Sequence, residues 1–309
     1  MRILFLGTPD FAVPSLASII EGPDTVVGVV SQPDRPRGRG LQPLPPPVVR
    51  LARESGIEVH QPKRLHTSEM LGILRALDPE LIVTCAFGKI LRRSLLDLPP
   101  EGCINVHASL LPRHRGAAPI PRMILDGDPW TGITIFRMDE GMDTGPILLQ
   151  RLERMPPDAT AGSLTERLSQ LGGLALQDAL ARIRSGTARY APQPEEGVTL
   201  APRLSKEDGR IDWAQPADRL ERFVRAMDPW PAARTVLRGA PLRIASLEPV
   251  DLIAGEAAPG TILSLDPDPV VAACPGCVRL GRVQAAGKKE MEASAWARGA
   301  RLRPGESLG

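Results

Sequence analysis

The chain has 309 residues, of which 42% are hydrophobic and 24% are charged, and its formal net charge is +2 at pH 7. This composition excludes an intrinsically disordered chain and allows a globular protein with two domains. A net charge so close to zero produces no general attraction to nucleic acid, so any contact with a polyanion must come from local clusters of basic residues.

The first half of the chain alternates short apolar runs with segments whose apolar residues recur at helical spacing. This alternation predicts an α/β fold with a Rossmann-like, mainly parallel sheet. The turn at Gly7 lacks the Gly-x-Gly-x-x-Gly pattern, so a nicotinamide oxidoreductase is disfavoured. Strands are predicted at residues 1–6, 25–30, 57–60, 81–84, 103–107, 132–136 and 146–151, and helices at 11–20, 48–55, 68–77 and 163–184.

A loop rich in arginine, glycine and proline follows the second predicted strand, at residues 31–43. Its three arginines, Arg35, Arg37 and Arg39, cannot pack in a core, so we expect the loop to be exposed. It is either a solvated loop or an arm that grips phosphate, because arginine matches the geometry of phosphate groups. Charge alone leaves both alternatives open.

The predicted strand at 103–107 carries the main candidate site. Because side chains alternate along a strand, Asn105 and His107 point to one face, while Ile104 and Val106 point to the other. Asn105 is also the only asparagine in the chain. A purely structural histidine is the alternative, since a lone histidine on a strand is more often a satisfied core residue than a catalyst.

A carboxylate for this site is expected in the loop after the strand at 132–136. An amide donor, an imidazole and a carboxylate together suit acyl transfer, in which donors stabilise an oxyanion and an acceptor takes a proton. The residues alone do not choose among Asp139, Glu140 and Asp143.

These segments closely resemble the formyltetrahydrofolate-dependent transformylases. The resemblance rests on Asn105-Val106-His107 and on the runs at 108–112, 115–119 and 139–145, which are long and specific. It implies a formyl transferase that uses 10-formyltetrahydrofolate and no metal. By this resemblance the catalytic residues are Asn105, His107 and Asp143, the folate segment is Ser109, Leu110, Leu111 and Pro112, and the pterin wall is Phe87, Gly88 and Ile90. The wall residues equally fit ordinary packing.

A proline-rich linker is predicted at 190–208. It separates a catalytic domain at 1–189 from a second domain at 209–309. Beyond the linker, a short helix and short strands at regular spacing predict a small β-barrel of the OB type. Cys274 and Cys277 have zinc-ligand spacing, but a hairpin turn between them is favoured.

The resemblance narrows to the methionyl-tRNA formyltransferases of that family, through the runs at 204–207, 228–231 and 286–289. In those proteins an insertion like 31–43 contacts the tRNA acceptor end, which makes Arg39 the leading contact. The implied partner is methionyl-initiator tRNA, with contacts at Arg35, Arg37, Arg39, Lys206, Lys288 and Lys289. The barrel has fourteen basic and twelve acidic residues, so its own charge is a weak signal.

Two further functions compete with this reading. The chain could be a transformylase that uses a small amine as acceptor, with identical chemistry. It could also be a non-catalytic nucleic-acid-binding protein on a Rossmann-like scaffold. We expect a cytoplasmic protein, because no run approaches the roughly 20 apolar residues of a membrane span and the N-terminus does not resemble a signal peptide. We also expect a monomer.

Overall fold

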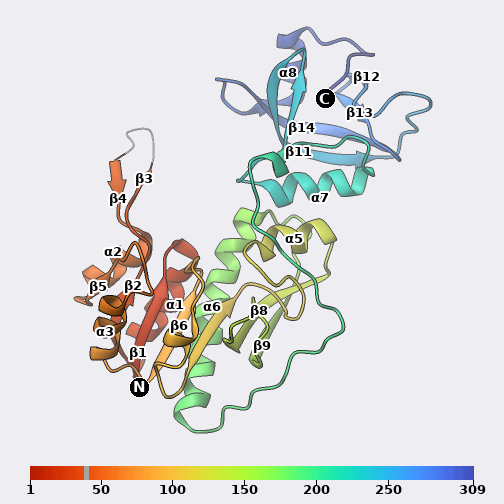
Figure 1. Cartoon of the computed structure of the whole chain (residues 1–309). Helices are drawn as coiled ribbons and strands as arrows, with labels where there is room; N and C mark the ends of the chain where they lie inside the picture. Colours follow the sequence, from red (N-terminus) through yellow and green to blue (C-terminus); the bar gives the residue numbers. More distant parts are fainter. Residues whose placement is uncertain (38–41) are drawn as a thin grey trace. The chain divides into compact units, whose positions relative to one another are not determined.

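The computed structural model describes residues 1–37 and 42–309, and the chain divides into two compact units (Figure 1). The first unit contains residues 1–119, 129–155 and 165–202, and the second contains 120–128, 156–164 and 203–309. Two short segments that precede the predicted linker, 120–128 and 156–164, therefore pack with the second unit.

The first unit is built on a seven-stranded sheet with the order β5-β2-β1-β6-β7-β8-β9. The first five strands are parallel, and β8 and β9 are added antiparallel at one edge. The Rossmann-like, mainly parallel prediction is thus confirmed. The strands are β1 (Arg2–Gly7), β2 (Thr25–Val30), β5 (Val59–His60), β6 (Leu81–Cys85), β7 (Cys103–His107), β8 (Trp130–Arg137) and β9 (Ile147–Arg154).

Helices flank this sheet, and most of them follow the predicted apolar periodicity. They are α1 (Val13–Ile20), preceded by a 3-10 turn at Asp10–Ala12, α2 (Pro47–Glu54), α3 (Ser68–Ala76), α4 (Arg93–Leu96) and α6 (Ala161–Arg184). The short α4 was not expected, because four residues are too few to show a helical period. A two-stranded hairpin, β3 (Arg35–Arg37) with β4 (Gln42–Leu44), carries the arginine-rich loop.

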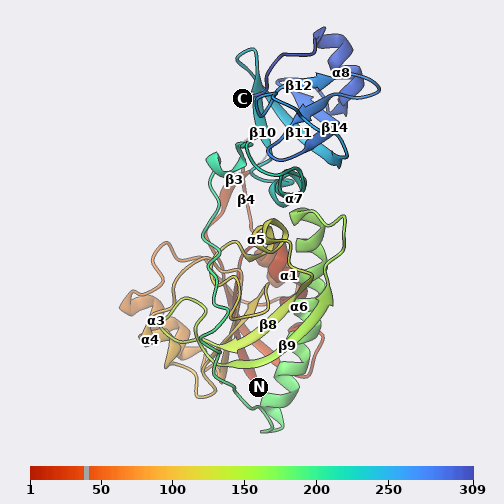
Figure 2. The ribbon, with the colours of Figure 1, turned by 90° about the vertical axis from the view of Figure 1, so that its right-hand side faces the viewer.

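One face of β7 lies against α6, because Val106 of β7 approaches Gly172 of α6 closely. Helix α6 runs beside α1 (Figure 2). A Cβ added to Gly172 would lie 3.1 Å from a side-chain carbon of Val106, and one added to Gly173 would lie 2.9 Å from the backbone oxygen of Pro14. Two glycines in the middle of α6 therefore permit a close approach that a larger residue would prevent. Val106 and Ile104, the apolar pair of β7, are both buried.

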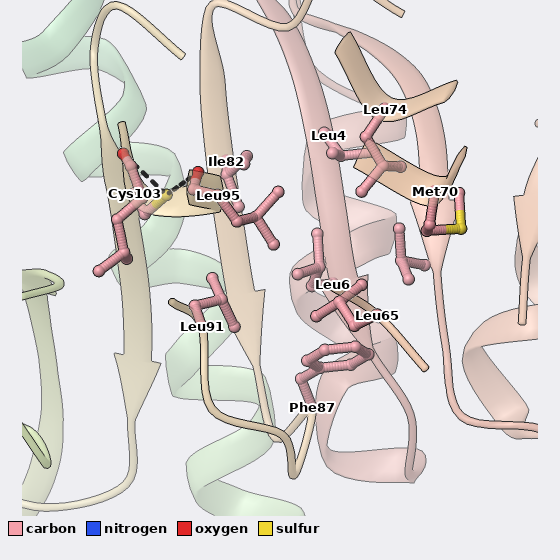
Figure 3. Close-up of a cluster of buried hydrophobic side chains, with 12 residues drawn as sticks. Leu4, Leu6, Leu65, Met70, Leu74, Ile82, Phe87, Leu91, Leu95 and Cys103 are labelled. Carbon is pink, nitrogen blue, oxygen red and sulfur yellow. Dashed lines mark hydrogen bonds between the residues drawn. The ribbon is translucent and has the colours of Figure 1, made fainter. Parts of the chain in front are cut away.

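The other face of β7 begins in a hydrophobic cluster, drawn in Figure 3. Cys103 lies at the end of this cluster that belongs to β7, and Phe87 joins it from the loop after β6. Alternation along the strand puts Cys103 on the same face as Asn105 and His107. Burial of Cys103 in this cluster thus anchors the start of β7, while the polar end of the strand carries Asn105 and His107.

The second unit contains a six-stranded antiparallel sheet, with the order β10-β11-β14-β13-β12 and β15 paired to β14. The C-terminal residues join its two edges, because Leu308 N donates to Gly260 O beside β12 and Gly309 N donates to Val236 O in β10. This closure confirms the predicted small barrel. Its strands are β10 (Arg234–Leu237), β11 (Ala240–Val250), β12 (Ile262–Ser264), β13 (Val270–Ala272), β14 (Cys277–Ala285) and β15 (Met291–Glu292).

Helices α7 (Ala217–Met227), α8 (Ala293–Ala300) and most of α5 (Pro119–Asp126) accompany the barrel. From α7, Arg222 donates to the carbonyl of Leu125, and Arg225 donates to the carbonyl of Ala159. These bonds explain why the segments 120–128 and 156–164 belong to this unit. Neither α5 nor α8 was predicted.

Residues 190–202, the first part of the predicted linker, lie in the first unit. Ala191 pairs with Ile147 at the start of β9, and Leu200 pairs with Arg115. We call this segment the strap. Over the two described stretches of the chain, no helix is both long enough and apolar enough to cross a membrane.

Candidate active site

Asn105 lies in the middle of β7, opposite Thr84 of β6. The Thr84 hydroxyl donates a hydrogen bond of 2.7 Å to Asn105 Oδ1. The carbonyl oxygen and the amino nitrogen lie on opposite sides of a planar amide, so this bond turns Nδ2 away from β6. Thr84 is only 2% exposed, whereas Asn105 is half-buried. The bond therefore leaves both amide N–H groups available to a ligand.

His107 is the last residue of β7 and is buried. Its ring meets Phe136 edge to face, with 6.3 Å between centroids. Phe136 lies opposite Asn105 in the register of β7 and β8. His107 and Asn105 consequently face the same side of the sheet, as the alternation of the strand requires.

The two ring nitrogens of His107 have different surroundings. Nε2 lies 3.0 Å from the backbone oxygen of His114, and Nδ1 lies 3.6 Å from Asp143 Oδ2. Because a carbonyl oxygen only accepts, Nε2 carries the proton in this bond. In the neutral ring Nδ1 has no proton and faces the Asp143 carboxylate. Nδ1 and Asp143 Oδ2 therefore form a pair that can take up one proton between them.

Opposing effects act on the pKa of His107. Burial lowers it, the Asp143 carboxylate raises it, and the bond to the His114 carbonyl also raises it; the net shift is downward from the ordinary value. The imidazole is therefore neutral at neutral pH, which is the form required of a base.

Asp143 is held in the loop between β8 and β9 by its own side chain and backbone. Its Oδ2 accepts a 2.7 Å hydrogen bond from Gly116 N, and its φ is +55°, in the left-handed region. Asp139 instead accepts from the Thr144 hydroxyl and from Gly141 N, and Glu140 is exposed. Of the three carboxylates left open by the sequence, Asp143 is thus the one beside the imidazole.

The residues predicted to hold folate follow β7 in a loop anchored to the antiparallel edge of the sheet. Thr134 of β8 donates to the Ser109 carbonyl at 2.6 Å and accepts from Leu111 N at 3.1 Å. Gln150 of β9 donates to the Leu111 carbonyl at 2.9 Å. The Ser109 hydroxyl is buried and donates to the Arg113 carbonyl, so it stabilises the loop itself.

Leu110 and Pro112 of this loop are half-buried, while Leu111 is buried. The predicted pterin wall is divided in the same way. Phe87 packs into the hydrophobic cluster, whereas Gly88 and Ile90 are exposed, Ile90 by 82%.

The backbone of that wall is tied to the start of the arginine-rich loop. Gln32 donates to the carbonyl of Phe87 at 3.0 Å, and a Cβ on Gly88 would lie 2.9 Å from the Gln32 amide nitrogen. A side chain at position 88 would collide with this contact. The start of the arginine-rich loop and the predicted pterin wall are thus in contact, although the sequence analysis considered them separately.

The predicted tRNA contacts fall into three places. Arg35 and Arg37 lie on β3, and Arg39 lies outside the described residues. Lys206 is exposed in the second unit, as are Lys288 and Lys289 in the turn after β14.

Thr84, Gly116 and His114 contact the candidate residues but were not identified from the sequence. Thr84 had a recognisable signal, since it is the one hydroxyl residue in the apolar run of β6. Gly116 and His114 act through backbone atoms, which leave no mark in side-chain patterns.

The cysteine pair of the second unit consists of free thiols, exposed at Cys274 and buried at Cys277. Among the described residues, no three His, Cys, Asp or Glu side chains gather in a group that could hold a metal ion.

Comparison with known proteins shows which families and relatives this chain resembles. A family model described as formyl transferase matches residues 1–180, and one described as formyl transferase, C-terminal domain, matches residues 203–301. The methionyl-tRNA formyltransferase of Magnetococcus marinus is 47% identical over 309 residues, which covers all of this chain and 98% of that protein.

Solved structures share the fold at lower identity. An N-formyltransferase from Helicobacter canadensis, in complex with folinic acid and dTDP-3-aminofucose, matches with a TM-score of 0.68 and 16% identity over 92% of this chain and 99% of that one. HypX from Aquifex aeolicus, in complex with tetrahydrofolic acid, matches with a TM-score of 0.60 and 18% identity over 96% of this chain and 47% of that one.

Proposed function

Because the chain belongs to the methionyl-tRNA formyltransferase family, we propose that it moves the formyl group of 10-formyltetrahydrofolate to the α-amino group of methionyl-initiator tRNA. The observation that carries the chemistry is the meeting of three groups: an oriented amide, a neutral imidazole and a carboxylate 3.6 Å from that imidazole. The identity across the full length of a relative named for this activity supports the acceptor.

The reaction begins when the α-amino nitrogen attacks the formyl carbon. A carbon–nitrogen bond forms, and the formyl oxygen becomes an oxyanion that accepts a hydrogen bond from Asn105 Nδ2. The attacking nitrogen now carries a surplus proton, which passes to the pair made by His107 Nδ1 and the Asp143 carboxylate, directly or through water. The imidazolium formed in this way places positive charge beside the oxyanion.

Collapse of the oxyanion restores the carbonyl and breaks the bond between the formyl carbon and the folate nitrogen. That nitrogen takes up a proton as it leaves, and we assign this proton to the His107–Asp143 pair. Protons therefore balance over one turnover. The downward pKa shift of His107 favours both halves of the cycle, because a neutral ring accepts the proton and a weakly basic ring readily returns it.

We assign folate binding to the loop at Ser109–Pro112 and to the exposed part of the 87–91 wall. The four backbone bonds that Thr134, Gln150 and Ser109 make within this loop hold it in one conformation, which lowers the entropy lost when a ligand binds. The second unit is assigned to tRNA because Lys206, Lys288 and Lys289 are exposed cations. The arginine-rich loop is assigned to tRNA because arginine matches the geometry of phosphate groups.

A small amine is the rival acceptor, and the Helicobacter canadensis protein was solved with an amino sugar nucleotide. The deciding measurement is transfer of labelled formyl from 10-formyltetrahydrofolate to charged initiator tRNA, run beside the same assay with an amino sugar nucleotide. We expect tRNA to be formylated and the sugar not to be.

Deletion of residues 35–40 sharpens this assay. The deletion should lower turnover of tRNA steeply and leave folate binding intact, since β3 and β4 carry no residue of the chemistry. Formylation of the sugar but not of tRNA by the intact protein would contradict the proposed acceptor. Full tRNA turnover by the deletion variant would contradict the role assigned to the arginine-rich loop.

A further inference from the structure

The strap, residues 190–202, has two side chains that differ from their neighbours. Between residues 191 and 200 every residue is exposed except Gln193 and Thr199, which are half-buried. A flexible linker would show no such pattern, because nothing would cover individual side chains within it. These two half-buried positions therefore indicate that the strap is held against the rest of the first unit through Gln193 and Thr199.

Gln193 uses every hydrogen-bonding position of its amide. Its Nε2 donates to the carbonyls of Asp143 and Gly145, at 2.8 Å each, and its Oε1 accepts from Arg115 Nε at 3.0 Å and Arg115 Nη2 at 2.7 Å. A side-chain amide has two N–H donors and two lone pairs, so all four are satisfied. Glutamate offers no donor to the two carbonyls, and asparagine is one methylene shorter.

The contact to Asp143 bears on an unfavourable backbone conformation. A residue other than glycine with φ near +55° costs on the order of 1 kcal/mol or more and persists where its surroundings determine it. Gln193 holds the carbonyl of this residue, while Gly116 N holds its carboxylate. These two bonds hold the carbonyl and the carboxylate of Asp143, so that Oδ2 faces His107.

Thr199 acts on the other side of the imidazole. Its hydroxyl accepts from His114 N at 2.8 Å, and the carbonyl of His114 accepts from His107 Nε2. The backbone of the strap continues this pairing, since Arg115 N donates to the Thr199 carbonyl at 2.9 Å. The strap therefore holds both groups that contact the His107 ring: Asp143, whose carboxylate faces Nδ1, and His114, whose carbonyl accepts from Nε2.

We propose that the strap is a clamp for the active site, in which Gln193 positions Asp143 and Thr199 positions His114 so that the imidazole stays between them. Gln193 and Thr199 are positioning residues, since they act through residues that they hold. The consequence for turnover rests on the proposed function, whereas the clamp itself is a statement about the free protein.

The test compares Gln193→Ala and Gln193→Glu with Glu196→Ala, a matched change at an exposed residue of the same strap. Formyl transfer is measured as kcat and KM for both substrates. Misplacing a reacting group by about 1 Å costs on the order of 100-fold in rate. We expect both Gln193 variants to lose kcat on this scale with KM little changed, and Glu196→Ala to match the wild type.

A second readout does not depend on activity. The Gly116 amide proton is bound to Asp143 Oδ2, so its hydrogen exchange, followed by NMR in the full chain, reports whether Asp143 is in place. Gln193→Ala should accelerate this exchange. Unchanged exchange at Gly116 would overturn the clamp. Faster exchange with unchanged kcat would leave the clamp standing and overturn the role of Asp143 in the reaction.

Thr199 provides an independent pair of variants if the Gln193 changes prevent folding. Thr199→Ser keeps the hydroxyl that accepts from His114 N and should retain turnover. Thr199→Val removes it at nearly the same volume and should lower kcat while KM is little changed. Equal turnover by the two variants would overturn the half of the clamp assigned to Thr199.

Discussion

The end of β7 and the strap serve the same site by different means. Asn105 and His107 project from a strand bonded to a neighbour on each side, so the sheet determines where their side chains point. The strap pairs with the rest of the unit through isolated bridges, and Gln193 and Thr199 act through individual hydrogen bonds. The reactive groups on β7 are thus held by the many backbone bonds of the sheet, whereas the strap depends on single contacts.

The largest effect is expected at β7. Asn105→Ala removes the oxyanion donor and should lower kcat by about 10²- to 10³-fold. His107→Ala removes the proton acceptor and should lower kcat by about 10²- to 10⁴-fold. Circular dichroism and thermal unfolding should show folded variants, because Asn105 is half-buried and β7 keeps its backbone bonds. The comparison fails if purified Asn105→Ala turns over like the wild type.

Thr84→Val should have a smaller effect of the same kind. It removes the hydroxyl that orients the Asn105 amide and keeps the shape of the side chain. One net hydrogen bond is worth about 1 kcal/mol, so a loss of up to about 10-fold in kcat is expected. Thr84→Ser should retain turnover. If Thr84→Val and Thr84→Ser have equal rates, the amide is oriented by something other than this bond.

The pH dependence of stability tests the environment of His107. Its pKa in the folded chain is below the ordinary value of about 6.5 because of burial. Near pH 6 the unfolded chain therefore binds more protons than the folded chain. The contribution of His107 to the free energy of unfolding is complete above its ordinary pKa and is lost as the pH falls towards its pKa in the folded chain.

One such group changes the free energy of unfolding by at most about 1.4 kcal/mol per pH unit. Urea unfolding at pH 7.5 and 5.5 should show this loss in the wild type, and a smaller loss in His107→Gln. An equal loss in both proteins would show that His107 is not buried in its neutral form.

The smallest effect is expected in the second unit, outside both regions. Lys288→Ala and Lys289→Ala should each weaken tRNA binding modestly and reduce the salt dependence of binding by roughly one unit of slope, as the loss of a phosphate contact does. Titrations at several salt concentrations measure this slope. Folate affinity should stay the same, and Glu256→Ala, an exposed change in the same unit, is the control.

The sequence alone determined the regular part of this protein. The bounds of β7, Cys103–His107, agree with the prediction, because Gly102 directly before the apolar run and Pro112 after it confine the strand to a short stretch. Period-two alternation then decided that Asn105 and His107 share a face. The parallel sheet and the barrel followed in the same way from the spacing of apolar runs.

The tertiary structure decided what periodicity does not encode. Phe87, expected in the wall of a slot, packs in the hydrophobic cluster. Residue patterns left three carboxylates open, and the left-handed backbone of Asp143 turned one of them to the imidazole. The first part of the predicted linker belongs to the site through Gln193 and Thr199. In a strand each side chain has a direction set by the repeat, but in a loop the direction depends on contacts with distant residues, which exist only once the chain has folded.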